Sequence, residues 1–197
     1  MAMTRWILTC FLLVASHPAL ADDEPVVIPW DANQSLCVAW EADKLFLLVS
    51  DERPVGMACE GAMVLEQGPE GVRSVVEVPV EAFNSGEEAR DEAVLEILSG
   101  GGAQTIVFKS KFLQRSDWRT LISGQSGTLE GDLTIAGITT SVKLNFKRDG
   151  QHITGRVETS FSALKLEPPS VGWGSITLVR DPLVLHFRFL QSLAFLL

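Results

Sequence analysis

Residues 142–161 read VKLNFKRDGQHITGRVETSF, and this stretch decides the fold. Apolar and polar residues alternate on both sides of Asp149-Gly150, first from Val142 to Lys147 and then from Ile153 to Phe161. A period of two places the apolar side chains on one face of a strand, and Asp-Gly between two such runs is typical of a tight β-turn. The stretch therefore predicts two antiparallel strands joined as a hairpin.

The same alternation recurs on both sides of this hairpin. It is present in residues 76–80, 105–109 and 183–190, and turn-forming residues such as Gly68-Pro69 and Asp181-Pro182 separate the runs. No linker or internal repeat divides the chain. The pattern predicts one all-β domain with an antiparallel sheet.

One segment departs from the period of two. Ser85-Gly86-Glu87-Glu88 has the spacing of a capping box, in which the Ser85 hydroxyl bonds the backbone N–H of Glu88. Apolar residues then follow helical spacing as far as Leu98, and residues 100–102 are all Gly. We expect one short helix at about residues 86–98, either as a lid or plug over a barrel end or as a plain crossover connection.

The charge balance excludes several classes of partner. The 197 residues include 16 Lys and Arg against 25 Asp and Glu, which gives a net charge of −9. Proteins that bind nucleic acids or anionic lipid surfaces carry an excess of basic residues, whereas this chain has an excess of acidic ones. Neither is therefore expected as a partner.

The first residues have the features of a secretion signal. Arg5 precedes an apolar run that is too short to span a bilayer, and Ala19-Leu20-Ala21 is a small-residue cleavage pattern. We expect residues 1–21 to be a signal peptide and residues 22–197 the exported domain, in the periplasm or secreted. Cys37 and Cys59 remain in that domain, and in an oxidising compartment they are expected to form a disulfide.

No catalytic or metal-binding constellation is visible. His152 and His186 stand at polar positions of separate strands without a neighbouring cluster of ligands, and Ser126 lacks the context of a hydrolase nucleophile. We therefore expect no catalytic residues, no metal and no cofactor. An exported enzyme remains an alternative that rests only on scattered carboxylates.

Two motifs resemble the YceI-like family. They are the run from Val78 to Gly86 with Ala89-Arg90-Asp91 and the short helix after it, and the segment Gly131-Asp132-Leu133-Thr134-Ile135-Ala136-Gly137-Ile138-Thr139. The resemblance covers roughly Val75 to Phe189. It implies an exported, lipocalin-like, eight-stranded antiparallel barrel whose interior holds a long isoprenoid-type lipid, with no established catalytic residues.

Strand parity predicts which side chains face the interior and would contact such a lipid. They are Phe108, Leu133, Ile135, Val142, Leu144, Val157, Leu185 and Phe187. A barrel of about eight strands can hold one small ligand or be filled by its own side chains. The bulky Phe residues leave a second hypothesis open, a structural or interaction domain with a solid core and no ligand.

The end of the chain is apolar. Residues 183–197 are too few, and too charged at His186 and Arg188, to span a bilayer. Three fates are open for residues 191–197: packing over a barrel end, a contact with a second copy in a homodimer, or a frayed end. Since exposed apolar patches favour association, we expect the first or the second.

Overall fold

A computed structural model describes residues 26–46, 50–102, 104–171 and 177–195. The predicted signal peptide, residues 1–21, lies outside the described residues, as do residues 196–197. None of the helices in the described part of the chain has the length and apolar character needed to cross a bilayer.

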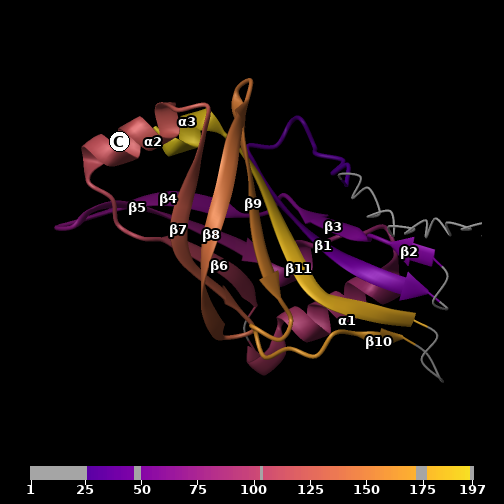
Figure 1. Ribbon diagram of the computed structural model, residues 1–197. Helices are drawn as coiled ribbons and strands as arrows, with labels where there is room; N and C mark the ends of the chain where they lie inside the picture. The colour runs from indigo at the N-terminus through magenta and orange to yellow at the C-terminus, as the bar shows by residue number, and fades with distance from the viewer. Residues whose placement is uncertain (1–25, 47–49, 103, 172–176, 196–197) are drawn as a thin grey trace, which may run out of the picture.

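Eight long strands in the described ranges form one antiparallel sheet that curls around a common core (Figure 1). They are β1 (Leu36–Phe46), β4 (Ala62–Gly68), β5 (Gly71–Pro79), β6 (Thr105–Ser110), β7 (Ser126–Ile135), β8 (Ile138–Asp149), β9 (His152–Ser160) and β11 (Thr177–Leu190). Three short strands, β2 (Ser50–Glu52), β3 (Val55–Ala58) and β10 (Ser170–Val171), pair with β1 or β11. The predicted all-β, lipocalin-like architecture with eight main strands is confirmed.

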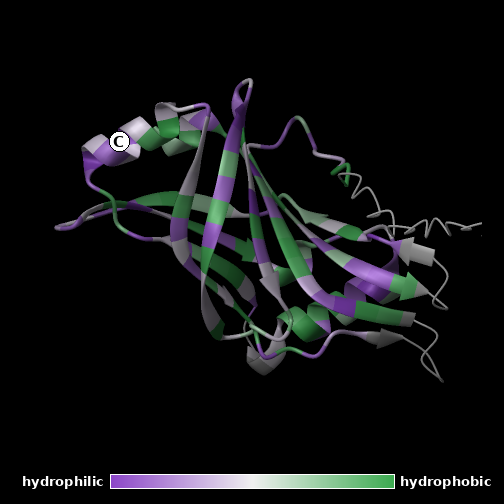
Figure 2. Cartoon of the chain, in the orientation of Figure 1, coloured by the Kyte–Doolittle hydropathy of each residue, from purple (hydrophilic) through white to green (hydrophobic). Residues whose placement is uncertain are grey.

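The register follows the sequence pattern. Asp149 pairs with His152 across the predicted hairpin, and Gly150 adopts the left-handed conformation, with φ of 61°, that such a turn requires. All eight residues predicted to face inward are buried, none more than 9% exposed. Along β8, apolar and polar residues alternate as expected (Figure 2), and Lys143 lies on the outside, 3.5 Å from Glu130.

The two ends of the curled sheet are not joined by a continuous ladder. In the described residues the strand order runs β2-β1-β11-β9-β8-β7-β6-β5-β4, so β1 and β4 do not pair directly. Instead β3 pairs with β1, and Met57 of β3 exchanges two backbone hydrogen bonds with Asn84, at 2.9 and 3.0 Å. The seam of the barrel therefore depends on β3.

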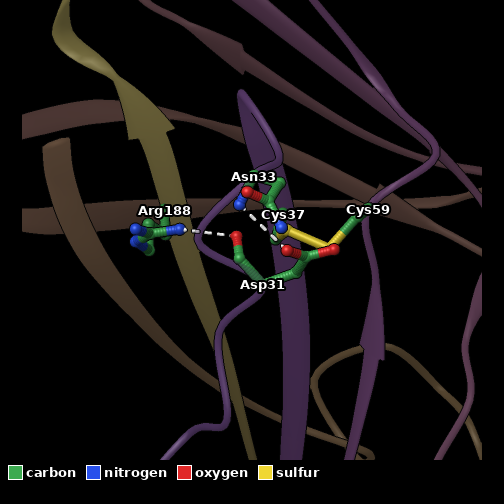
Figure 3. Close-up of a disulfide and its surroundings, with 5 residues drawn as sticks. All are labelled: Asp31, Asn33, Cys37, Cys59 and Arg188. Atoms are coloured by element: carbon green, nitrogen blue, oxygen red, sulfur yellow. Dashed lines mark hydrogen bonds between the residues drawn. A yellow bond between two sulfur atoms is a disulfide. The ribbon is translucent and has the colours of Figure 1, made fainter.

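A disulfide fastens this seam. Cys37 of β1 is bonded to Cys59, the residue that follows β3, with the two Cα atoms 4.1 Å apart (Figure 3). Beside it, Arg188 of β11 donates a hydrogen bond of 2.9 Å to the backbone oxygen of Asp31. The segment that leads into β1 is thereby tied to the outer face of β11.

The helices lie at the ends of the barrel (Figure 1). They are α1 (Glu88–Leu98), α2 (Arg115–Ser123), α3 (Gln191–Ala194) and the 3₁₀ turns η1 (Val80–Ala82) and η2 (Gly100–Gly102). Helix α1 is the predicted helix, but the expectation of a single inserted helix is wrong, because α2 joins β6 to β7. Trp118 and Ile122 of α2 are buried, four residues apart on one face.

Helix α2 packs at one end of the barrel together with the end of the chain. The Trp118 indole N–H donates a hydrogen bond of 3.1 Å to the backbone oxygen of Ala194, and both residues are buried. Residues 191–195 therefore pack over one end of the barrel, which is the first of the three fates considered for the end of the chain.

Candidate functional site

An apolar pocket of about 130 Å³ lies between α1 and the inner side of the sheet. From α1, Ala89, Ala93, Val94, Ile97 and Leu98 line it, and from β1 and β11 Trp40, Ala42, Val179 and Leu183. The only charged side chains in its described lining are Lys44, Glu87 and Arg90. A concave, mainly apolar site with few polar groups is typical of a small-molecule binding pocket.

Trp40 is the largest residue of the pocket. It points inward from β1, opposite Gly56 of β3, and is 4% exposed. A Cβ atom placed on Gly56 would lie only 2.4 Å from the Trp40 indole nitrogen, so the ring packs directly over the backbone of β3. Gly56 therefore creates the space that the indole ring occupies.

Helix α1 covers the pocket loosely. Val94 and Ile97 are only partly buried against the core, and of the whole helix Leu98 alone is buried. A helix with so little buried apolar surface gains little free energy from its packing. It has the properties of a lid rather than of a core element.

The start of α1 is held by side chains of its first turns. The Asp91 carboxylate accepts hydrogen bonds from the Ser85 backbone N–H, at 2.9 Å, and from the Ser85 hydroxyl, at 2.5 Å. The predicted capping box is wrong, because this hydroxyl bonds Asp91 and no side chain caps Glu87, the residue that precedes the helix. Arg90 donates a hydrogen bond of 2.8 Å to the Ser85 hydroxyl, so Ser85 is bonded to both Arg90 and Asp91.

Both basic residues of the pocket are already paired with carboxylates. The Lys44 ammonium lies 3.4 Å from Glu52, and the Arg90 guanidinium lies 3.0 Å from Glu87. Lys44 and Arg90 are about one quarter exposed, so these pairs form the rim of the pocket rather than its floor.

Phe161 of the pocket is positioned by a turn after β9. The Ser162 hydroxyl and backbone N–H both donate to the Asp181 carboxylate, at 2.7 and 2.8 Å. These hydrogen bonds lower the pKa of Asp181, since they stabilise its charged form. The Phe161 backbone N–H also donates to the Asp181 backbone oxygen, at 3.0 Å.

A second cavity, of about 30 Å³, lies near the opposite end of the barrel under α2. Phe108, Leu144 and Phe187 line it, together with Trp118. The ring centroids of Phe108 and Phe187 are 6.1 Å apart, so aromatic side chains fill the middle of the barrel.

The predicted ligand-binding residues are thus brought together inside the barrel, but none of the eight lines the larger pocket. Three line the small cavity, and Leu133, Ile135, Val142, Val157 and Leu185 line neither. The parity prediction identified the interior, and contact of these residues with a ligand stays a prediction. Sequence reasoning missed Trp40, which shares one face of β1 with Leu36, Val38 and Ala42. Cys37 and Ala39 between them are also apolar, so the alternation of this strand is weak.

The two histidines lie outside the pocket, among polar groups of the outer face. His186 stands at a polar position of β11, and its Nε2 atom lies 2.7 Å from the buried Glu41 carboxylate. His152 Nδ1 lies 3.3 Å from the Arg188 guanidinium. Burial, with a smaller contribution from Arg188, lowers the pKa of His152.

The comparisons with known proteins agree with this architecture. The family model of the YceI-like domain matches residues 55–189. A solved polyisoprenoid binding domain from Saccharophagus degradans, described as implicated in plant cell wall breakdown, has a TM-score of 0.51 at 9% identity, and the match covers 79% of this chain and 96% of that one. At this identity the likeness shows the fold alone.

Two further solved structures have TM-scores below 0.5. Burkholderia cenocepacia BcnA is 16% identical with a TM-score of 0.49, over 76% of this chain and 94% of that one. The Campylobacter jejuni YCEI protein is 14% identical with a TM-score of 0.42, over 91% and 96%. No curated protein matches the chain.

Proposed function

This chain belongs to the YceI-like domain family, and on that premise we propose that it is an exported, non-enzymatic binding protein for a long isoprenoid-type lipid. One observation is central to the proposal: the apolar pocket of about 130 Å³ between α1 and the sheet. The polyisoprenoid-binding domain with the same fold supports the class of ligand.

The size of the pocket sets how such a lipid would bind. An engineered apolar cavity of about 150 Å³ binds benzene, so this pocket has room for about one isoprene unit as it stands. A longer chain would displace α1 from the sheet or leave the pocket across its rim. The loose packing of Val94 and Ile97 favours displacement of α1.

The energetics require a long ligand. Each buried methylene contributes about 0.8 kcal/mol, whereas association costs roughly 4–15 kcal/mol. A chain of a few carbons would therefore bind weakly, and several isoprene units are needed for tight binding. Storage, sequestration or transport of the lipid between membranes are all compatible with this scheme.

A second candidate function is supported by the packing of the barrel centre. Phe108 and Phe187 are 1% and 2% exposed and line the smaller cavity, and this close packing favours a solid-core structural or interaction domain. In that case the pocket under α1 would be a packing defect without a physiological ligand.

Titration of the mature protein, purified without detergent, with a fluorescent farnesyl probe distinguishes the two functions. Ala93→Trp places an indole in the pocket and should weaken probe binding at least tenfold. Glu96→Trp adds the same ring on the exposed side of α1 and is the matched control, with an unchanged affinity. Equal affinities of both variants and the wild type, or no binding by a well-folded wild type, would exclude a lipid site in this pocket.

Export can be tested separately. We expect the protein in the periplasmic or secreted fraction, with Asp22 as its first residue after cleavage. N-terminal sequencing of the fractionated protein checks both points, and an intact residue 1 on a cytoplasmic protein would contradict them.

A further inference from the structure

We propose that a groove on the outer face of the sheet binds a phosphate monoester that carries an apolar or aromatic group. The groove has a volume of about 530 Å³ and is lined by residues 26–30 and by side chains of β1, β8, β9 and β11. None of its described lining residues also lines the pocket under α1. This inference therefore concerns a second site and does not rest on the proposed function.

One wall of the groove is apolar. Every second residue of the segment before β1 lines it, namely Val26, Ile28 and Trp30. Val27 and Pro29 between them do not line the groove and are exposed. The three lining side chains are only partly buried, and they share the groove with polar residues of the outer face. An apolar group of a ligand that covered them would gain free energy by leaving water.

The rest of the lining is mostly polar and comes from neighbouring strands. Arg156 of β9 stands between Asn145 of β8 and His186 of β11 in the strand register. One row further along, Lys147 of β8 pairs with Thr154 of β9. Residues paired in this way have Cβ atoms about 4.5–5.5 Å apart, so these side chains are close enough to contact one ligand.

The charges of the groove favour an anion. Its charged residues in the described lining are Glu41, Arg53, Lys147, Asp149, Arg156 and His186. The Glu41 carboxylate is buried and lies 2.7 Å from His186 and 3.7 Å from Arg53, so its charge is compensated within the protein. Asp149, at the hairpin end of β8, is the other carboxylate of the lining. In a chain with a net charge of −9, this groove is a local concentration of basic groups.

Two of these basic groups are accessible to a ligand. Lys147 is exposed, and its ammonium has no partner among the described residues. Arg156 is about half exposed and lies 3.2 Å from Glu158, which is 72% exposed. Exposed ion pairs contribute little stability, so a phosphate can replace Glu158 as the partner of Arg156. A lysine and an arginine bind phosphate through charge-assisted hydrogen bonds. The phosphate is thereby assigned to Lys147 and Arg156, and the apolar group to the wall that contains Trp30.

Calorimetric titration with naphthyl phosphate, inorganic phosphate and naphthol tests the proposal. The wild type should bind naphthyl phosphate at least tenfold more tightly than the other two, because it alone has both groups. Lys147→Gln and Arg156→Gln should each weaken its binding about three- to tenfold, as expected for the loss of one exposed charge-assisted hydrogen bond. Lys143→Gln, on the same face of β8 but outside the groove, is the matched control with an unchanged affinity.

The apolar wall is tested with Trp30→Ala. This variant should bind naphthyl phosphate about tenfold more weakly than the wild type, because the ring of the probe loses its apolar contact. Its affinity for inorganic phosphate should change less than twofold. Equal losses for both probes, or no loss for either, would contradict the role of Trp30.

Two results would overturn the proposal as a whole. The first is equal affinity of the wild type, Lys147→Gln, Arg156→Gln and the control variant for naphthyl phosphate, or no binding by the folded wild type. The second concerns Asp22-Asp23-Glu24, the acidic run that precedes the groove segment in the sequence. If naphthyl phosphate binds only after these three residues are replaced by their amides, the groove belongs to the acidic run and not to a phosphate ligand.

The source of the phosphate is identified with farnesyl monophosphate, titrated into Ala93→Trp, in which the pocket under α1 is filled. Tighter binding than that of naphthyl phosphate indicates a lipid phosphate, and weaker binding indicates a soluble phosphate ester. In both cases addition of Lys147→Gln should weaken binding. Because Ala93→Trp tests the pocket and Lys147→Gln tests the groove, the failure of either proposal leaves the other standing.

Discussion

Replacing Trp118 by Phe tests the packing of the chain end against α2. The substitution keeps an aromatic ring but removes the N–H that donates to the Ala194 backbone oxygen at 3.1 Å. Both residues are buried, so the acceptor would be left without a partner inside the protein.

The expected loss of stability follows from two contributions. Leaving a buried acceptor unpaired costs about 1–3 kcal/mol. The smaller ring also enlarges the adjacent cavity, which at about 24 cal/mol per Å³ adds about 1 kcal/mol. The total of about 2–4 kcal/mol corresponds to a decrease in melting temperature of roughly 4–16 °C for a domain of this size.

A double-mutant cycle by urea denaturation isolates the contact. Deletion of residues 191–197 removes the acceptor, and in that background Trp118→Phe should cost only about 1 kcal/mol, the cavity contribution. Trp30→Phe, at a half-buried position of the segment before β1, is a control that should cost under about 0.5 kcal/mol. If Trp118→Phe lowers the free energy of unfolding by the same amount, within about 0.5 kcal/mol, in the full-length protein and in the deletion variant, the coupling between α2 and α3 is refuted.

Three further predictions concern the disulfide, the pH dependence and the pocket wall. Cys59→Ser should lower the free energy of unfolding by about 3 kcal/mol, as expected for a closed loop with a separation of 22 residues, and a reductant should then affect only the wild type in urea titrations. The pKa of His152 is lowered in the folded state, first by burial and then by Arg188, so the unfolded chain binds more protons than the folded one. The free energy of unfolding should therefore fall as the pH drops below about 6.5. His152→Gln should make the free energy of unfolding depend less steeply on pH. Gly56→Ala should cost about 1–3 kcal/mol by overpacking against Trp40, and a crystal structure with an undisturbed indole ring would contradict the close contact.

The sequence was sufficient for those features that depend on neighbouring residues. Asp149-Gly150 specifies its own hairpin, and the alternation around it determines which face of β8 and β9 is buried. Helix α1 was predicted from its apolar spacing and from the Gly residues after it. Helix α2 was not predicted, although Trp118, Leu121 and Ile122 have helical spacing, because nine residues between two strands are easily taken for a connection.

Features that depend on distant residues were beyond such reasoning. The contact of Trp40 with Gly56 follows from the pairing of β1 with β3. The pairing of His186 with Glu41 requires that the last strand lie beside the first. No local pattern encodes these registers, and the pocket under α1 depends on them in the same way.

The pairing of β1 with β11 has a consequence for how the chain reaches this structure. Among the described residues these are the first and the last long strands, so β1 lacks its main partner until β11 has been synthesised. Contacts between residues so far apart in sequence form late, because the entropy of closing a long loop opposes them. Until then the inward apolar faces and the unpaired edges of β1 and β9 are exposed, and such edges promote aggregation. A chain with this strand order would therefore depend most on chaperones in the interval between the synthesis of β9 and the synthesis of β11.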